Sequence, residues 1–482
     1  MTQIKPRAAS LTPPVVDDSI FREYDIRGTV GQTLTVDTAY HVGCAFGTYC
    51  RKQGLRNVAV CYDGRLTSPQ LKSAVEEGLM RVGCQVVSVG MGPTPMLYFA
   101  VKHLPTDAGI MITGSHNPPD MNGFKMTTKN GPVFGQAVQD IKAIIQTQDY
   151  SHGTGTQHDS PVKSAYVARL LKDARLSGTS LNIAWDAGNG AAGAVLPALL
   201  DKLPGQHLQL YCDVDGRFPN HHPDPTVDKN LADLIAAVKT YKCDLGIAFD
   251  GDADRIGVVD ENGTVIRSDM LLALYAAEVL ERHPGAPIIG DIKSSAVLFD
   301  EVTRLGGQPV IWKTGHSMIK SKMQELNAPL AGELSGHIFF ADGYYGFDDG
   351  LYCAIRLLNL LADTQGEKTL SQLMAHLPQL HATPEIRFEV PESDKFALIT
   401  RMQDLVRAQK NHHSDWDLID IDGIRVNTPD GWWLMRASNT QNALSTRVEA
   451  VSADALARLK QQAMDIARQV GISFSFDADN QH

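Results

Sequence analysis

The chain has 482 residues, of which 21% are charged and 43% hydrophobic, and its formal net charge is −11. This length exceeds one compact core and favours about three to four domains of a soluble globular protein. The acidic balance, with no long basic run, excludes a nucleic-acid-binding surface, and no stretch reaches the roughly 18 consecutive apolar residues of a membrane helix.

The N-terminal segment and the cysteines bear on the compartment. Residues 1–18 contain prolines and no apolar run, so we expect no signal peptide. The seven cysteines are isolated, odd in number and without a CxxC pair, which favours reduced thiols over disulfides or a metal site. We predict a cytoplasmic monomer that binds neither nucleic acid nor membranes. A few local cations can still hold one phosphate, so a small phosphorylated ligand is compatible with the acidic chain.

Short β-branched runs recur through the first three quarters of the chain, each ending in a polar or glycine-rich turn that a helix-like stretch follows. This alternation predicts α/β units around a mainly parallel sheet. The runs form three groups, at 57–65, 84–95 and 109–118, at 181–190, 208–220 and 245–255, and at 286–295, 308–317 and 328–337. Each group opens with a strand that ends in aspartate, at Asp63, Asp186 and Asp291. Because their spacing is domain-sized, we predict three similar α/β domains.

The rest of the chain predicts a linker and a different last domain. Residues 148–163 are rich in Gly, Ser, Thr and His and predict a linker. After about residue 377 the pattern changes to a strand, a helix, a hairpin signal at TPDGWW (428–433) and a final helical stretch. We therefore predict three mixed-sheet α/β domains at 1–161, 162–264 and 265–377, and a smaller C-terminal α+β domain at 378–482, around a central cleft. Loops at the carboxyl ends of strands form the ligand crevice in such sheets, so the third loop of each repeat should reach this cleft.

The loop TGSHNPPDMNGFK (113–125) ends the third strand of the first group and presents Ser115 on a turn. A serine becomes a covalent carrier only if neighbouring groups assist its deprotonation and stabilise the developing charge. His116 and Lys125 are available for that purpose. The same residue types also form ordinary surface turns, which stays an alternative.

The loop DGDADR (250–255) places carboxylates at Asp250, Asp252 and Asp254. Alternate residues of an extended segment project to one side, so the three can converge on one cation, and Mg²⁺ suits them when a phosphate supplies another oxygen. A calcium EF-hand matches in part, with Glu261 at the twelfth loop position, but Arg255 replaces the glycine needed at the sixth and strands flank the loop. A solvated acidic turn is the simpler alternative.

The loop GELSGH (332–337) supplies Glu333, Ser335 and His337. A carboxylate accepts hydrogen bonds from sugar hydroxyls, and an imidazole exchanges protons near neutral pH. Alone, this hexapeptide is also compatible with an ordinary loop.

The loop RASNTQN (436–442) offers an arginine fork, hydroxyls and amides at Arg436, Ser438, Asn439 and Thr440. Such a set suits a phosphate dianion. A hairpin end with an exposed arginine is its alternative interpretation.

Taken together in this order, the four loops resemble the α-D-phosphohexomutase superfamily, and most closely its bifunctional phosphomannomutase/phosphoglucomutase branch. The resemblance runs from FREYDIRG (21–28) to the last loop. It implies that Ser115 is the phosphoserine and that the three aspartates bind Mg²⁺ with a phosphoryl oxygen. It also implies that Glu333 and Ser335 hold sugar hydroxyls, and that the 436–440 loop anchors the phosphate that is not reacting. Further positions that match family contacts are Tyr24, Arg27, Lys125, Arg255, Lys293, His316 and His337.

The resemblance also implies a reaction, the reversible transfer of a phosphoryl group between C1 and C6 of mannose and glucose phosphates. A phosphoserine enzyme and a bound, reorienting hexose 1,6-bisphosphate, which also acts as activator, would carry it. Mg²⁺ and Lys125 would neutralise charge while His337 or His116 handles the proton, with Arg27 also at the reacting group. The sequence departs from the common family pattern at Ala253, in place of a frequent glycine, and at Leu334, in place of methionine. Gln441 and Asn442 also follow the phosphate loop where several family members have other residues. Phosphoglucosamine mutase, a phosphoserine sugar-phosphate hydrolase and a non-catalytic sugar-phosphate sensor stay open.

Overall fold

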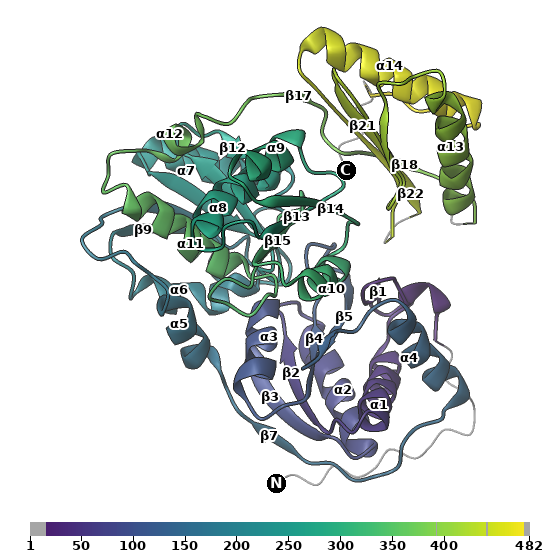
Figure 1. Cartoon of the computed structure of the whole chain (residues 1–482). Helices are drawn as coiled ribbons and strands as arrows, with labels where there is room; N and C mark the ends of the chain where they lie inside the picture. The colour runs from purple at the N-terminus through teal and green to yellow at the C-terminus, as the bar shows by residue number, and fades with distance from the viewer. Residues whose placement is uncertain (1–15, 392, 440–441, 477–482) are drawn as a thin grey trace.

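The computed structural model describes residues 16–391, 393–439 and 442–476. They form four β-sheets with their helices, which we number as domains I to IV in chain order (Figure 1). Domains I to III have mixed sheets and domain IV has an antiparallel one, so the predicted fold class is confirmed. Among the described residues, no helix has both the length and the apolar character that crossing a membrane demands.

Domain I is built on a sheet in the order β1-β5-β4-β2-β3-β7, with β6 paired to β5. The strands are β1 (Ile26–Thr29), β2 (Asn57–Tyr62), β3 (Gln85–Met91), β4 (Ala108–Ile112), β5 (Met121–Thr128), β6 (Gly131–Pro132) and β7 (Gln157–Asp159). The helices are η1 (Asp18–Ile20), α1 (Val36–Lys52), α2 (Ser68–Arg81), α3 (Thr94–His103) and α4 (Gln136–Thr147). Part of the predicted linker is not free chain, because β7 pairs with β3 at the sheet edge.

Domain II has the strand order β12-β11-β10-β8-β9. Its strands are β8 (Asn182–Asp186), β9 (Gln206–Leu210), β10 (Leu245–Phe249), β11 (Ile256–Asp260) and β12 (Val265–Ile266). Its helices are α5 (Lys163–Leu171), η2 (Ala191–Ala194), α6 (Leu196–Leu200), η3 (Asp228–Leu231) and α7 (Ala232–Tyr241).

Domain III has the strand order β14-β13-β15-β16. Its strands are β13 (Pro287–Asp291), β14 (Gln308–Trp312), β15 (Leu330–Gly332) and β16 (Ile338–Phe340). Its helices are α8 (Ser268–Arg282), α9 (Ala296–Arg304), α10 (His316–Leu326), α11 (Gly350–Asp363) and α12 (Leu370–Met374).

The first three sheets repeat one topology. In each, the strand that ends in aspartate pairs in parallel with two neighbours, and a fourth strand returns antiparallel to one of them. The shared order is β5-β4-β2-β3, β11-β10-β8-β9 and β16-β15-β13-β14. The central strands, such as β4 and β10, are buried along their whole length, as expected of strands covered on both faces. The turns after β4, β10 and β15 therefore occupy corresponding places.

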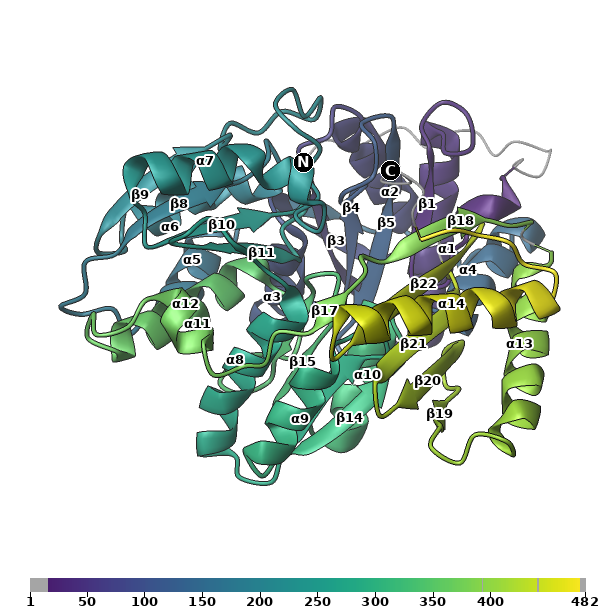
Figure 2. The ribbon, with the colours of Figure 1, turned by 90° about the horizontal axis from the view of Figure 1, so that it is seen from above.

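Domain IV is smaller and has the order β17-β22-β21-β20-β19, with β18 also paired to β22. Its strands are β17 (His381–Ala382), β18 (Ile386–Glu389), β19 (Asp417–Ile419), β20 (Ile424–Thr428), β21 (Gly431–Ala437) and β22 (Ala443–Ala450). The helices α13 (Lys395–Lys410) and α14 (Ala453–Gln469) share one apolar cluster with this sheet (Figure 2). The predicted hairpin joins β20 to β21, and the Ser452 hydroxyl caps α14.

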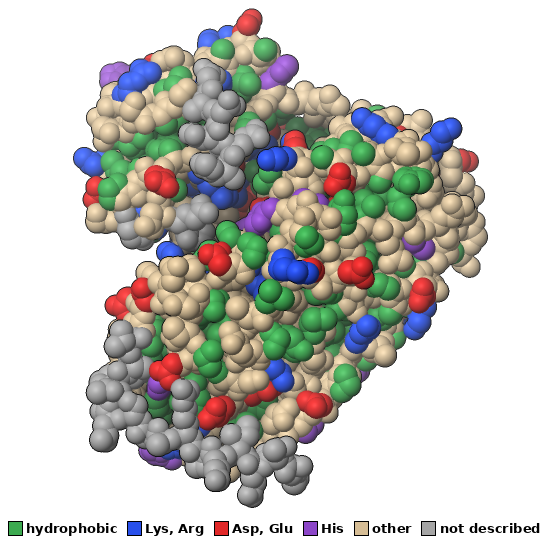
Figure 3. Space-filling view, turned by 180° about the vertical axis from the view of Figure 1, so that it is seen from behind, with side chains coloured by type: hydrophobic (Ala, Val, Ile, Leu, Met, Phe, Trp, Pro, Cys, Tyr) green, Lys and Arg blue, Asp and Glu red, His purple; other side chains and the backbone are tan. Residues whose placement is uncertain are grey.

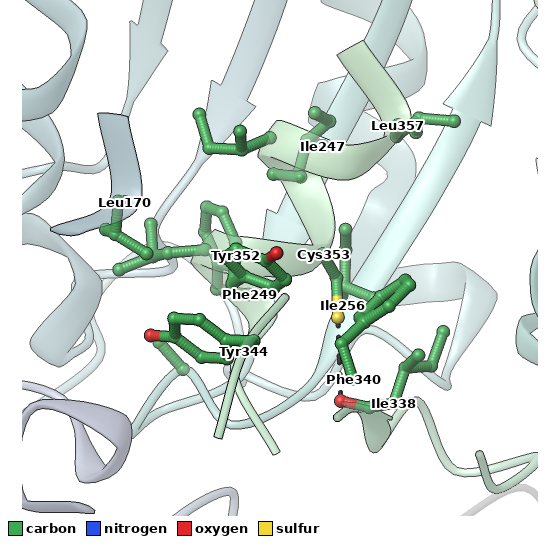
Figure 4. Close-up of a cluster of buried hydrophobic side chains, with 14 of the residues drawn as sticks. Leu170, Ile247, Phe249, Ile256, Ile338, Phe340, Tyr344, Tyr352, Cys353 and Leu357 are labelled. Carbon is green, nitrogen blue, oxygen red and sulfur yellow. Dashed lines mark hydrogen bonds between the residues drawn. The ribbon is translucent and has the colours of Figure 1, made fainter. Parts of the chain in front are cut away.

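The apolar core is continuous through domains I to III, whereas domain IV has its own. Helix α11 lies where domains II and III meet, and its Tyr352 and Cys353 lie beside Phe249 and Ile256 of domain II in one apolar cluster (Figure 4). A small apolar cluster, formed by Ile292 of domain III with Trp432 and Leu434, joins domain IV to the rest. All seven cysteines are free thiols.

Candidate active site

The four predicted loops are joined by side-chain contacts between domains. Ser115, after β4, contacts Asp250, after β10, and Arg255 of the second loop contacts His337 of the third. Asn439, after β21, reaches Tyr24 of domain I. Seen from behind, the surface is hollowed between domain IV and the rest of the molecule, and Lys, Arg and His side chains lie at this hollow (Figure 3).

Ser115 is held in an unusual backbone conformation. Its φ of +49° lies in the left-handed region, which costs a non-glycine residue about 1 kcal/mol or more. Its amide donates to Thr113 Oγ1 over 2.8 Å. Its hydroxyl donates to Asp250 Oδ2 over 2.8 Å and lies 3.1 Å from His116 Nδ1. Ser115 is 1% exposed, so this is not a surface turn.

The three aspartates of the second loop are fully buried and converge, with one oxygen of each within 4.8 Å of the others. Asp252 Oδ1 and Asp254 Oδ1 are buried and accept no hydrogen bond from the described residues. Convergent carboxylates that keep buried oxygens without a hydrogen-bond partner are a donor set suited to a hard divalent cation. The solvated-turn interpretation is therefore wrong, and the residues fit a metal ion. Ala253 has a φ of +56°, a left-handed backbone conformation that favours glycine.

Lys125 supplies the nearest positive charge to these carboxylates. Its Nζ lies 2.7 Å from Asp252 Oδ2 and also contacts Asp254 Oδ2. Burial alone would raise the pKa of Asp252, but Lys125 and a hydrogen bond from Thr94 outweigh it, so the pKa lies well below its usual value. Burial and the two neighbouring carboxylates raise the pKa of Asp250 well above its usual value. Asp250 is the member of the three that faces the Ser115 hydroxyl.

Two candidate proton carriers differ in their surroundings. Burial, with the charges of Arg255 and Arg27, holds the pKa of His116 well below its usual value, so its imidazole is neutral. His337 Nε2 accepts from Arg255 Nε over 3.0 Å, which requires the proton on Nδ1, and Nδ1 lies 3.1 Å from Asp348 Oδ2. His116 is therefore the histidine in direct contact with the Ser115 hydroxyl.

The third loop forms a second polar cluster. Glu333 Oε1 accepts from the Gly315 amide over 2.6 Å, whereas Glu333 Oε2 is buried and has no partner among the described residues. Burial raises the pKa of Glu333. His316 stacks on His337 with ring centroids 5.3 Å apart, and Ser335 is half-buried on the same loop. One free carboxylate oxygen beside two stacked imidazoles is suited to accept hydroxyl hydrogen bonds.

Tyr24 connects three domains. Its hydroxyl donates to the Thr314 carbonyl of domain III over 2.7 Å and accepts from Asn439 Nδ2 of domain IV over 2.5 Å. In domain IV, Arg436 Nε donates to Asp422 Oδ2 over 3.0 Å and is buried beside Ser438. Thr440 lies outside the described residues.

The remaining predicted cations lie at the edges of the cluster. Arg27 Nε donates to Asp25 over 2.7 Å, and its Nη1 donates to Asn117 Oδ1 of the Ser115 loop over 2.8 Å. Lys293 Nζ lies 3.2 Å from Glu385 Oε2. Lys293 is thus linked to domain IV rather than directly to the other predicted residues.

Several residues of the site were not predicted from the sequence, namely Thr94, Asp348, Glu385 and Asp422. Thr94 follows β3 in GMGPTP, and Asp348 stands in GFDDG, where two adjacent carboxylates are both buried. An acidic pair next to a helix start was the signal for Asp348, but nothing in the local pattern pointed to Glu385.

Four domain families match successive parts of the chain. They are described as phosphoglucomutase/phosphomannomutase alpha/beta/alpha domains I, II and III, at residues 18–152, 164–263 and 267–381, and the C-terminal domain, at 385–466.

Individual proteins match over nearly the whole chain. A phosphomannomutase/phosphoglucomutase of Pseudomonas aeruginosa is 44% identical over 447 residues, 93% of this chain and 95% of that protein. A phosphoglucomutase of Neisseria gonorrhoeae is 43% identical over 92% of this chain and 95% of its own. The crystal structure of a phosphoglucomutase/phosphomannomutase family protein from Burkholderia thailandensis superimposes with a TM-score of 0.89 at 42% identity, covering 95% of this chain and 98% of that one.

Proposed function

The chain belongs to the phosphoglucomutase/phosphomannomutase family, and we propose that it moves a phosphoryl group reversibly between C1 and C6 of mannose and glucose phosphates. Ser115 carries that group between the two positions. The observation that supports this most directly is the Ser115 hydroxyl, which is buried in a left-handed turn against Asp250 and His116.

In the forward step, a free sugar hydroxyl attacks phosphorus of phosphorylated Ser115. The new bond joins the sugar oxygen to phosphorus, the bond to Ser115 Oγ breaks, and the hydroxyl proton goes to a nearby base. His116 and His337 are the candidates for that base. The product is a bound hexose 1,6-bisphosphate, which turns end for end and returns its other phosphoryl group to Ser115.

Asp250, Asp252 and Asp254 would hold Mg²⁺, which when bound neutralises charge on the transferring phosphoryl group. Lys125 and Arg27 add fixed positive charge on the domain I side, since both side chains lie close to the Ser115 loop or the aspartates. Phosphoryl transfer depends mainly on such positioning and neutralisation.

The other loops would hold the sugar phosphate in both of its poses. Glu333 and Ser335 accept hydrogen bonds from sugar hydroxyls, and Tyr24 and His316 also contact the sugar. The phosphate that is not reacting is bound by Arg436, Ser438, Asn439 and Thr440, with Arg255 and Lys293 adding positive charge. Lys293 pairs with Glu385 and Arg436 with Asp422, and both cations are buried. Each is suited to exchange its carboxylate partner for a phosphate oxygen.

We further propose that a hexose 1,6-bisphosphate activates the protein and that it acts in the cytoplasm as a monomer, without nucleic acid or membrane partners. The seven free thiols support a reducing compartment.

Phosphorus NMR tests the reaction class. Purified protein with Mg²⁺ and a trace of glucose 1,6-bisphosphate receives mannose 1-phosphate or glucose 1-phosphate in parallel samples. We expect both 6-phosphates and no inorganic phosphate. Accumulating phosphate would indicate the hydrolase, and no change in either sugar would favour the amino-sugar mutase or the sensor.

Two variants test the assigned residues. Ser115→Ala should abolish turnover while sugar phosphate still binds, and turnover like that of the wild type would refute the phosphoserine mechanism. Asp252→Asn should sharply weaken the dependence of turnover on Mg²⁺, whereas an unchanged metal titration would refute the metal site.

A further inference from the structure

Arg65 reaches the Ser115 loop from the turn that follows β2. Its Nη1 donates to the carbonyls of Pro118, over 2.5 Å, and Met121, over 2.9 Å. Its Nη2 donates to the carbonyls of Ser115, over 2.7 Å, and Asn117, over 2.5 Å. Arg65 is only 1% exposed. One buried guanidinium thus satisfies four carbonyl groups of this single loop.

Asp63 holds the same loop from its amide side. Its Oδ2 accepts from the Gly114 amide over 3.2 Å, and its Oδ1 accepts from the Arg65 amide and the Ser68 hydroxyl. Arg65 Nε lies 3.4 Å from Asp63 Oδ2, so the carboxylate also orients the guanidinium. The loop is therefore held by hydrogen bonds at the Gly114 amide, just before Ser115, and at the Ser115 carbonyl.

The threefold repeat supplies an internal comparison. The corresponding aspartate of domain III, Asp291, accepts from the Leu334 amide over 3.2 Å, much as Asp63 does from Gly114. Two positions after it stands Lys293, whose ammonium pairs with Glu385 instead of loop carbonyls. In domain II the same position is Gly188. Of these three corresponding positions, the one in domain I alone carries an arginine.

We propose that Arg65 is a positioning residue that fixes the orientation of Ser115 for phosphoryl transfer. The left-handed backbone of Ser115 persists only where its surroundings hold it, and Arg65 anchors the carbonyl of that residue. With the carbonyl fixed, the hydroxyl stays aligned with Asp250 and His116. Misplacement of a reacting group by about 1 Å can cost about 100-fold in rate.

The geometry requires an arginine. A planar fork can donate to four acceptors in one plane, whereas a lysine ammonium has only three donors in a tetrahedral arrangement. Gly114 keeps the fork in place, because a Cβ on residue 114 would lie 2.4 Å from Arg65 Nε. Gly114→Ala should therefore displace the guanidinium without removing it.

The test measures how fast Ser115 becomes phosphorylated, and it rests on the proposed carrier role of that serine. Dephosphorylated protein is mixed with Mg²⁺ and glucose 1,6-bisphosphate, and the phosphorylated fraction is followed by intact mass spectrometry. The variants are Arg65→Lys and Gly114→Ala. Arg356→Lys is the matched control, since Arg356 is an equally buried arginine that pairs with Glu278 and Asp342, away from the loops.

We expect phosphorylation about 100-fold slower in Arg65→Lys and slower in Gly114→Ala. KM for glucose 1-phosphate should stay unchanged, because Glu333, Ser335 and Arg436 belong to other domains and the contacts of Tyr24 are to Thr314 and Asn439. Arg356→Lys should lower the melting temperature without slowing phosphorylation. Wild-type rates in both loop variants, or loss of folding in both, would overturn the proposal, since Arg65 would then have no role or only a structural one. Failure of the wild type to become phosphorylated on Ser115 would refute the proposed function itself.

Discussion

Replacing Lys125 by Met should lower the free energy of unfolding, because three buried carboxylates then lie together without the lysine charge. Lys125 comes from β5, its side chain is 4% exposed, and it contacts two fully buried aspartates, Asp252 and Asp254. Methionine keeps much of the length of the side chain and removes its charge. The variant therefore leaves buried carboxylates without their nearest cation.

The size of the effect follows from the burial of this pair. Removing one partner of a buried ion pair costs about 3–5 kcal/mol. Arg255 Nε, 4.0 Å from Asp250 Oδ2, retains part of the compensation, so we expect about 3 kcal/mol. A loss of about 1 kcal/mol lowers the melting temperature of a domain of about 150–250 residues by about 2–4 °C. The metal-free variant should therefore melt about 6–12 °C below the wild type.

A divalent cation should restore most of that loss. At a concentration about 100 times its dissociation constant, a ligand that binds only the folded state stabilises it by about 2.7 kcal/mol. The assay compares melting temperatures in EDTA and in Mg²⁺. Lys72→Met is the control, because Lys72 pairs with Glu76 in the same domain, away from the aspartates. Lys125 does not neutralise the aspartates if Lys125→Met and the wild type have the same melting temperature in EDTA. The same conclusion follows if Mg²⁺ raises the melting temperatures of the wild type and both variants equally.

Two other perturbations have expected outcomes. Burial raises the pKa of Asp349 from 3.8 to about 6 despite a hydrogen bond from Tyr166, so the folded protein holds this proton more tightly than the unfolded chain does. The free energy of unfolding should then fall by up to about 3 kcal/mol as pH rises from about 4 to 6. In urea titrations, the Asp349→Asn variant should gain stability relative to the wild type over the same pH range. A stability difference that does not change with pH would contradict the raised pKa of Asp349. Tyr24→Phe removes the hydrogen bonds to Thr314 and Asn439, so KM for glucose 1-phosphate should rise about tenfold, and an unchanged KM would mean that these contacts do not support binding.

The strand pattern was sufficient to predict the fold class, because buried strands that end in a polar turn leave a local signature. The three strands that end at or just before Asp63, Asp186 and Asp291 all exist, and each lies in the interior of its sheet. The composition of the predicted linker did not indicate that its residues Gln157–Asp159 pair with β3, since strand pairing at a sheet edge depends on a partner far along the chain.

The site could be predicted only in part. Residues with distinctive chemistry in short motifs, such as Asp250 and Asp252, were identified because spacing alone places them together. Thr94 and Arg65 were not, since each acts on a loop that is distant in sequence, Thr94 on Asp252 and Arg65 on Ser115. Supporting contacts of this kind depend on the tertiary arrangement, which local patterns do not encode.

The repeated sheets of domains I to III also divide labour in a way that favours divergence. Each sheet keeps one strand order while its third loop carries different side chains, a serine in domain I, carboxylates in domain II and Glu333 in domain III. Because the three sheets are separate copies of one scaffold, substitutions in one loop leave the other two loops intact. Substitutions around Glu333 could retune which sugar is accepted while the phosphoryl chemistry of the first two sheets is inherited unchanged.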